Sequence, residues 1–194
     1  MTDLFPPSEF DPWAETYDQD VINLTQFSFD DYEQVLDQVV RQANPLAGMS
    51  LLDIGTGTGN LALHFAELGS ELWCTDFSEP MLEKARAKLP TAHFISHDFR
   101  TDWPAELESK RFDRIVSAYV FHHVGQARKI EICKELVTQH LNSGGKLVIA
   151  DLSFPTLPYR EMFSKRVGDK WDDAPYWIVG TAIPALEKTG LRVE

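Results

Sequence analysis

The chain has 194 residues, 43% of them apolar and 25% charged, with a formal net charge of −12 at pH 7. This length suits one domain with a full hydrophobic core, and the composition is that of a globular protein in water. The negative charge argues against a nucleic-acid partner, because contacts to a phosphate backbone need a basic face.

The sequence also limits the compartment. No apolar run approaches the length of a membrane span, and no signal-peptide pattern precedes Asp3. Cys74 in a predicted strand and Cys133 in a predicted helix are typical of reduced, buried thiols. We therefore expect a cytoplasmic protein, a monomer or homodimer, with no membrane partner and no metal site.

The N-terminal quarter predicts helices. Residues 1–12 contain three prolines and predict a loose arm. Trp13, Tyr17 and Val21 recur at helical spacing, and this periodicity alone favours a helix that packs its aromatic stripe on the domain. Asp30 can cap the next helix as part of a capping box. That helix has an apolar face made by Tyr32, Val35, Leu36, Val39 and Val40.

The stretch LLDIGTGTGNLA, residues 51–62, predicts a buried strand, a tight glycine turn and the start of a helix. Glycine is needed where the backbone takes positive φ or where a ligand approaches too closely for a Cβ atom. The helix N-terminus that follows offers unpaired N–H groups to a bound molecule. We expect a nucleotide-like ligand at this turn.

Three ligands compete for this turn. A loop that binds ATP or GTP needs Lys and then Ser or Thr after its last glycine, but Asn60 and Leu61 follow Gly59. The dinucleotide fingerprint places a glycine where this chain has Asn60. Asp53, directly before the loop, suits a positively charged ligand better than a pyrophosphate. S-adenosylmethionine carries an ammonium and a sulfonium and no phosphate.

The second predicted strand, Leu72 to Thr75, ends at Asp76, and Ser78 can cap the helix that follows. An acid about twenty residues past such glycines hydrogen-bonds ribose hydroxyls in nucleotide-binding sheets. A simple helix-initiating acid is the alternative, and the upstream glycine loop favours the ribose interpretation. Phe77 would then offer a ring face to adenine.

Three more strands are predicted. The third, Ala92 to Ser96, leads into Asp98 and Phe99, and the fourth, residues 112–118, ends at Ala118. His122 and His123 pass over the carboxyl end of the fourth strand, where ligands lie in open α/β sheets. The remaining predicted segments are a fifth strand from Lys146 to Ala150, an irregular aromatic-rich insertion over 153–180, a helix over 182–189 and the beginning of a sixth strand at 191–194.

Two motifs carry a family resemblance. The run D-x-G-x-G-x-G and the later pattern F-D-x-I-V-S-x-x-x-x-H-H-V resemble class I S-adenosylmethionine-dependent methyltransferases. The similarity runs from about Trp13 to Val193, and the C-terminal part is similar to the small bacterial methyltransferases labelled YrrT-like. The D/N-P-P-Y/F motif of base-modifying DNA methyltransferases is absent.

The resemblance implies that S-adenosylmethionine is the cofactor. It implies a cofactor site made by Asp53, Gly55, Gly57, Gly59, Asp76, Phe77, Asp98, Phe99 and Ala118. In the family, an acid at the position of Asp98 accepts a hydrogen bond from the adenine amino group, but an exposed loop acid is an equally good interpretation. The run W-A-E-T-Y-D is similar to the segment with which such enzymes cover the cofactor, which adds a functional interpretation to Tyr17.

Strands that alternate with helices predict an α/β fold with a doubly wound, mostly parallel sheet. We expect one methyltransferase domain over 1–194, in which 1–45 form a helical lid and 153–180 lie near the substrate. Only four residues follow Gly190, so the final edge strand of the family's sheet is expected to be missing.

The function expected from this resemblance is methyl transfer to a small, partly apolar acceptor walled by Tyr17, Trp171 and Tyr176. An NAD-dependent oxidoreductase is an alternative that Asn60 and Asp98 disfavour, and a non-catalytic protein that only binds the cofactor is another. His122 and His123 are candidates for a general base because histidine titrates near neutrality. The sequence itself favours a packing role for one of them and solvent exposure for the other.

Overall fold

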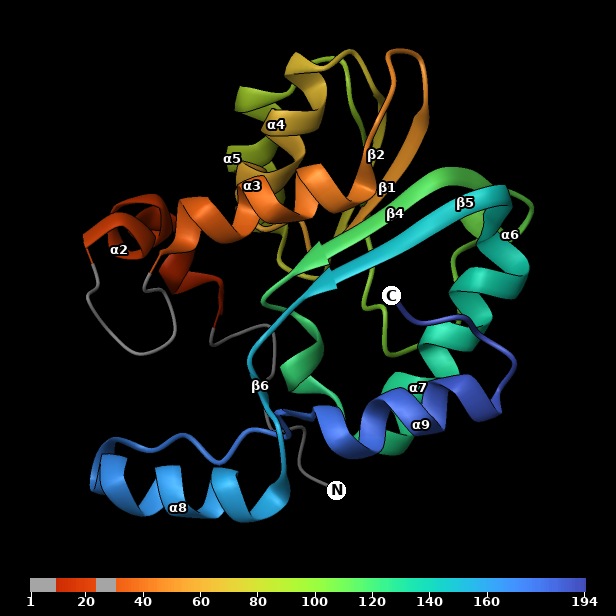
Figure 1. Cartoon of the computed structure of the whole chain (residues 1–194). Helices are drawn as coiled ribbons and strands as arrows, with labels where there is room; N and C mark the ends of the chain where they lie inside the picture. Colours follow the sequence, from red (N-terminus) through yellow and green to blue (C-terminus); the bar gives the residue numbers. More distant parts are fainter. Residues whose placement is uncertain (1–9, 24–30) are drawn as a thin grey trace.

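The computed structural model describes residues 10–23 and 31–194. Five strands form one sheet in the order β3-β2-β1-β4-β5, and all its pairings are parallel (Figure 1). The strands are β1 (Ser50–Ile54), β2 (Glu71–Asp76), β3 (His93–Ser96), β4 (Phe112–Ala118) and β5 (Leu141–Ala150). The strand order reverses between β1 and β4, and ligands bind at such a reversal, beyond the carboxyl ends of the strands.

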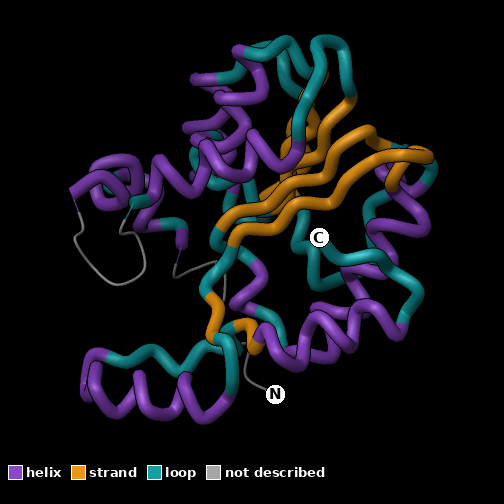
Figure 2. Tube along the Cα trace, viewed as in Figure 1, coloured by secondary structure: helices purple, strands orange, loops and turns teal. Residues whose placement is uncertain are grey.

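Helices cover both faces of the sheet, as Figures 1 and 2 show. One face carries α3 (Tyr32–Ala43), α4 (Asn60–Glu67) and α5 (Glu79–Lys88), and the other carries α6 (Ala105–Glu108), α7 (Gln126–Glu135) and α9 (Val179–Lys188). This arrangement confirms the predicted doubly wound α/β fold.

The central strands are apolar throughout because both of their faces are buried. Successive side chains point to opposite faces, so Leu51 packs with the core under α3 and α4 while Leu52 packs with the core under α7. Ile115 and Val116 of β4 divide in the same way. Across the described residues, no helix combines the length and the apolarity needed to cross a membrane.

The N-terminal helix differs from the prediction. A 3-10 turn, η1 (Pro12–Glu15), and a short helix, α2 (Tyr17–Asn23), replace the single helix expected over Trp13 to Val21. The turn ends where Thr16 N donates to Trp13 O, a hydrogen bond of the 3-10 kind. The predicted cap Asp30 lies outside the described residues, and Asp31 takes the N-cap position of α3 without a side-chain cap hydrogen bond.

The expectation that residues 153–180 are irregular is wrong for much of that segment. It contains β6 (Ser153–Phe154), α8 (Leu157–Val167) and β7 (Trp177–Ile178), and β6 and β7 pair in parallel. The side chain of Thr156 caps α8 by accepting from Tyr159 N, and Pro158 occupies the first turn. No residue of α8 is buried, so the helix lacks the apolar periodicity that would have revealed it.

The predicted sixth strand is also wrong, because residues 191–194 form no strand. Leu191 instead packs against the core on the α7 side of the sheet. Among the described residues the sheet ends at β5, which has no antiparallel neighbour.

We predict that Gly59→Ala destabilises the fold more than Gly48→Ala, although both glycines have similar backbone angles, with φ of 88° and 82°. A Cβ at Gly59 would lie 3.2 Å from Ala85 Cβ, whereas one at Gly48 would meet nothing within 4 Å. Positive φ should cost each variant about 1–2 kcal/mol of unfolding free energy, and overpacking should add about 1–3 kcal/mol at Gly59 only. Urea unfolding measures both, and equal losses would contradict the packing argument.

Candidate functional site

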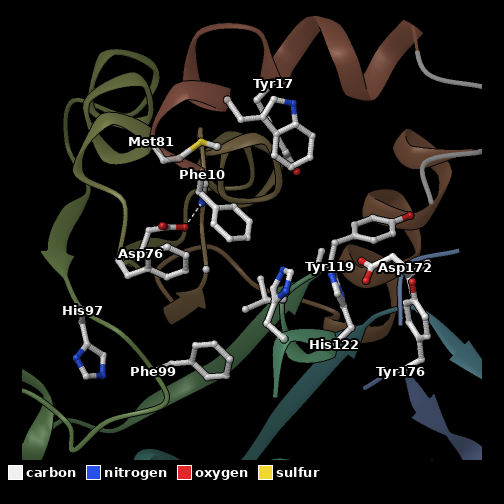
Figure 3. A pocket seen from close by; sticks show the side chains of 18 residues that line it. Phe10, Tyr17, Asp76, Met81, His97, Phe99, Tyr119, His122, Asp172 and Tyr176 are labelled. Carbon is white, nitrogen blue, oxygen red and sulfur yellow. Dashed lines mark hydrogen bonds between the residues drawn. The ribbon is translucent and has the colours of Figure 1, made fainter. Parts of the chain in front are cut away.

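A cavity of about 340 Å³ opens at the carboxyl ends of β1, β2 and β4 (Figure 3). The N-terminal segment, the glycine loop, the ends of β2, β3 and β4, and the segment after β5 all contribute to it. Its lining residues are Phe10, Trp13, Tyr17, Gly55, Gly57, Asp76, Phe77, Met81, His97, Phe99, Ala118, Tyr119, Val120, His122, His123, Leu152, Asp172 and Tyr176. Eight of the twelve cofactor and acceptor residues named from the sequence are among them, as are both candidate histidines.

The glycines of the loop differ in what they do. Gly55 and Gly57 line the cavity, and Gly59 does not. Gly57 has φ of 54°, and a Cβ there would meet nothing within 4 Å, so its backbone is open to the cavity. Gly59 instead packs against Ala85 of α5 and allows helix α4 to begin there.

Asp76 closes β2 and holds the glycine loop. Its Oδ2 accepts from Gly57 N at 2.9 Å and its Oδ1 accepts from Ser78 N at 2.9 Å. Burial raises the pKa of Asp76 to about 6, and the backbone hydrogen bonds counter part of that rise. Each oxygen retains a lone pair for a further donor.

Asp53 lies outside the cavity lining, although the sequence suggested direct cofactor contact. It is almost fully buried and accepts from the Thr56 hydroxyl at 2.7 Å. Burial raises the pKa of Asp53 to about 7, which the Thr56 hydrogen bond counters in part. Asp53 thus supports the loop from beneath.

The end of β3 is arranged differently from the expectation. Phe99 lines the cavity, but Asp98 does not, and both carboxylate oxygens of Asp98 accept from Arg100. Burial alone would raise the pKa of Asp98, but hydrogen bonds from Arg100 outweigh it and lower the pKa. The Arg100 guanidinium also lies 5.7 Å from the centre of the Phe77 ring. His97, which the sequence did not single out, lines the cavity in place of Asp98.

The N-terminal segment reaches over the glycine loop. Tyr17 lines the cavity, while the adjacent Asp18 accepts from Thr58 Oγ1 at 2.5 Å and from Asn60 Nδ2 at 3.1 Å. Asp18 also forms an ion pair of 2.6 Å with Lys88 of α5. These contacts fix where Tyr17 enters the cavity.

Phe10 is a lining residue that sequence reasoning missed. Its ring meets the ring of Phe77 edge-on, with centroids 5.1 Å apart, and lies 5.2 Å from the His123 ring. The next residue, Asp11, accepts from the Ser78 hydroxyl at 2.7 Å. No local pattern marks Phe10, because its partners are more than sixty residues away in the chain.

The two candidate histidines both line the cavity, with ring centroids 4.0 Å apart. His123 is largely buried against Phe10, and burial lowers the pKa of His123 to about 2. His122 Nδ1 lies 2.6 Å from Oδ1 of Asp151, the acid that directly follows β5.

The segment 153–180 was expected to bring Trp171 and Tyr176 to the acceptor, and only one of them reaches the cavity. Tyr176 lines the cavity and Asp172 joins it, but Trp171 does not. Trp171 packs against Phe154 and Tyr176, with ring centroids 5.8 Å and 5.2 Å away. In Figure 3, Asp76 and Met81 lie on one side of the cavity, and His122, Tyr119, Tyr176 and Asp172 lie on the other.

The chain is similar to known methyltransferases. Residues 51–145 match a family model described as a methyltransferase domain. An uncharacterized methyltransferase of Bacillus licheniformis is 37% identical over 162 residues, which cover 81% of this chain and 71% of that protein. The uncharacterized methyltransferase YrrT of Bacillus subtilis is 32% identical over 149 residues, with 75% of this chain and 66% of that protein covered. The chain spans 66% to 74% of the length of such curated relatives.

A solved structure shares the fold. The crystal structure of a TehB-like SAM-dependent methyltransferase from Corynebacterium glutamicum matches 97% of this chain and 86% of its own, with a TM-score of 0.65 and 18% identity. The relatives above 30% identity, together with the glycine motif and the strand order, show that this chain belongs to the family of class I S-adenosylmethionine-dependent methyltransferases.

Proposed function

We propose that this chain transfers a methyl group from S-adenosylmethionine to a small-molecule acceptor. The proposal rests on the lining of one cavity. Asp76 and Gly57, which are hydrogen-bonded to each other, lie on one side of it, and aromatic side chains and the two histidines line the other side. When bound, S-adenosylmethionine supplies a methyl carbon activated by its positively charged sulfur. The chain's own part is to bind and orient the two reactants and to keep water out.

The residues of the Asp76 side fit the cofactor. Asp76 is buried at the cavity wall with a free lone pair on each oxygen, which suits a ribose with two hydroxyls. Gly57 leaves room for close approach to its backbone. Phe77 and Phe99 offer ring faces for adenine, and Gly55 and Ala118 border the region between them and the acceptor.

The opposite side of the cavity supports a small acceptor. Tyr17, Tyr119 and Tyr176 bring aromatic faces, and Asp172 brings a carboxylate. These mainly apolar faces support a small, partly apolar acceptor. In this arrangement the N-terminal segment acts as a lid, and Trp171 supports Tyr176 from behind.

Turnover separates this proposal from its alternatives. Calorimetry should show binding of S-adenosylmethionine and S-adenosylhomocysteine but not of NAD. Formation of S-adenosylhomocysteine in the presence of candidate acceptors then distinguishes an enzyme from a protein that only binds the cofactor.

We predict that Asp76→Ala weakens binding of S-adenosylmethionine by on the order of 2–4 kcal/mol, because charged hydrogen bonds contribute roughly 1.5–3 kcal/mol each. Calorimetry measures the change. Asp102→Ala is the control, because Asp102 is exposed and outside the cavity lining. Unchanged affinity in Asp76→Ala would contradict the cofactor assignment.

The affinity for S-adenosylmethionine should fall about tenfold between pH 7 and pH 5. With a pKa of about 6, only about a tenth of Asp76 is ionised at pH 5, and the ionised form is the acceptor for ribose hydroxyls. The same raised pKa makes folding less favourable as pH rises from about 4 to 6, because the unfolded chain has then released a proton that the folded chain keeps. In Asp76→Asn the affinity, although weaker, should vary much less with pH over this range, and a persisting tenfold change would assign the effect to another group such as Asp53, whose pKa burial raises to about 7.

We predict that Asp18→Ala weakens cofactor binding roughly three- to tenfold, because it frees α2 from Thr58, Asn60 and Lys88. Glu15→Gln is the matched control in the same segment, since its ion pair with Lys84 is more exposed and such pairs contribute little. Calorimetry on both variants gives the comparison. An equal effect of the two substitutions would show that the Asp18 contacts do not matter for binding.

A further inference from the structure

The end of β5 places a buried acid behind a histidine of the cavity. His122 Nδ1 lies 2.6 Å from Asp151 Oδ1, and the Asp151 side chain is only 1% exposed. The same Oδ1 accepts from Leu152 N at 2.8 Å, and Oδ2 accepts from Trp177 Nε1 at 3.2 Å. The position of this carboxylate is therefore set by three groups, which come from the segment between β5 and β6, from β7 and from the 3-10 turn that carries His122.

The contact between His122 and Asp151 determines which nitrogen of His122 carries the proton. An ionised carboxylate can only accept, so Nδ1 of His122 is the donor in this contact. In a neutral imidazole this leaves the lone pair on Nε2. No group of the described residues bonds Nε2, and His122 lines the cavity with its ring 6.2 Å from the Tyr176 ring.

His122 and His123 differ in their surroundings. His123 packs on Phe10, and burial lowers its pKa to about 2, so that it is a far weaker base. The other titratable groups around His122 are Tyr119, Tyr176 and Asp172 along the cavity. Lys129, whose charge interacts with that of Asp151, donates to Pro175 O.

We propose that Asp151 is a positioning residue that holds His122 as the general base of methyl transfer, with Nε2 directed to the acceptor. This inference rests on the proposed function. The acceptor heteroatom forms a bond to the methyl carbon as the bond from that carbon to sulfur breaks, and the electron pair of the broken bond goes to sulfur. The proton of the acceptor moves to His122 Nε2, which becomes an imidazolium beside Asp151.

The substrate class follows from this chemistry. A base is needed only where the acceptor atom must lose a proton. The acceptor is accordingly a protic group, a hydroxyl, a thiol or an ammonium, on a small molecule that fits between Tyr119 and Tyr176. An acceptor atom that has no proton to lose would gain nothing from the His122 and Asp151 pair.

A purely structural role for Asp151 makes a different prediction. Its Oδ2 also anchors Trp177 of β7, so loss of the carboxylate could act by loosening β7. Trp177→Phe removes that anchor and leaves the contact between His122 and Asp151 Oδ1 in place. Trp177 lies outside the cavity lining, which makes this variant a matched control.

The first test reads the tautomer directly and needs no acceptor. Nitrogen NMR of the full chain with labelled histidine, assigned with His122→Gln, should show the proton of neutral His122 on Nδ1. Asp151→Asn should move at least part of it to Nε2, because an amide group can donate to Nδ1. Trp177→Phe should leave it on Nδ1. A wild-type His122 protonated on Nε2, or an Asp151→Asn spectrum like that of the wild type, would overturn the proposal.

The second test is kinetic. Small phenols, thiols and amines serve as probe acceptors with S-adenosylmethionine, and S-adenosylhomocysteine is the readout. For a probe that is methylated, Asp151→Asn and His122→Gln should each lower kcat by about 10²–10⁴, the usual contribution of general-base catalysis. Calorimetry should show cofactor affinity within about twofold of wild type in both. A kcat of Asp151→Asn equal to that of the wild type would overturn this proposal. Failure of the wild-type chain to bind S-adenosylmethionine would instead overturn the proposed function.

Discussion

The hydrogen bonds that Asp76 accepts from Gly57 and Ser78 are the contacts on which the site depends. They join the glycine loop after β1 to the helix start after β2, two backbone segments that parallel pairing already brings side by side. Because the loop has positive φ at each of its glycines, it could not keep this shape with side chains in their place. A buried acid therefore shapes the backbone at the point where the cavity opens.

The two sides of the cavity are built in different ways. The Asp76 side comes from consecutive strand ends of the sheet, so its geometry follows from the fold. The other side comes from segments that are tied down individually, α2 through Asp18 and the residues before β7 through Gln126 and Lys129, which donate to Tyr176 O and Pro175 O. Variation in those tethers can change an acceptor without disturbing the sheet, which is how one fold hosts many substrates.

The sequence predicted the parts of the site that sit at strand ends. Asp76 and the glycine loop could be located because a buried strand followed by glycines or an acid has a local pattern. Phe10 and the link between Asp18 and Lys88 could not, because they depend on contacts between residues distant in the chain. Helix α8 was missed because none of its residues is fully buried and its apolar face is weak. Asp98 is the reverse case. Its local pattern predicts a contact with the cofactor, but the nearby Arg100 donates hydrogen bonds to its carboxylate.

Burial leaves Asp53 with a pKa of about 7, so near neutrality this carboxyl group is divided between its protonated and ionised forms. It lies beneath the glycine loop, bonded to Thr56. A cation that comes to rest above the loop favours the ionised form and expels the proton. Binding of a sulfonium compound is thereby coupled to proton release, and binding of the uncharged thioether left after transfer is coupled to it less strongly. Replacement of the cofactor by the spent product would then be accompanied by proton uptake at Asp53.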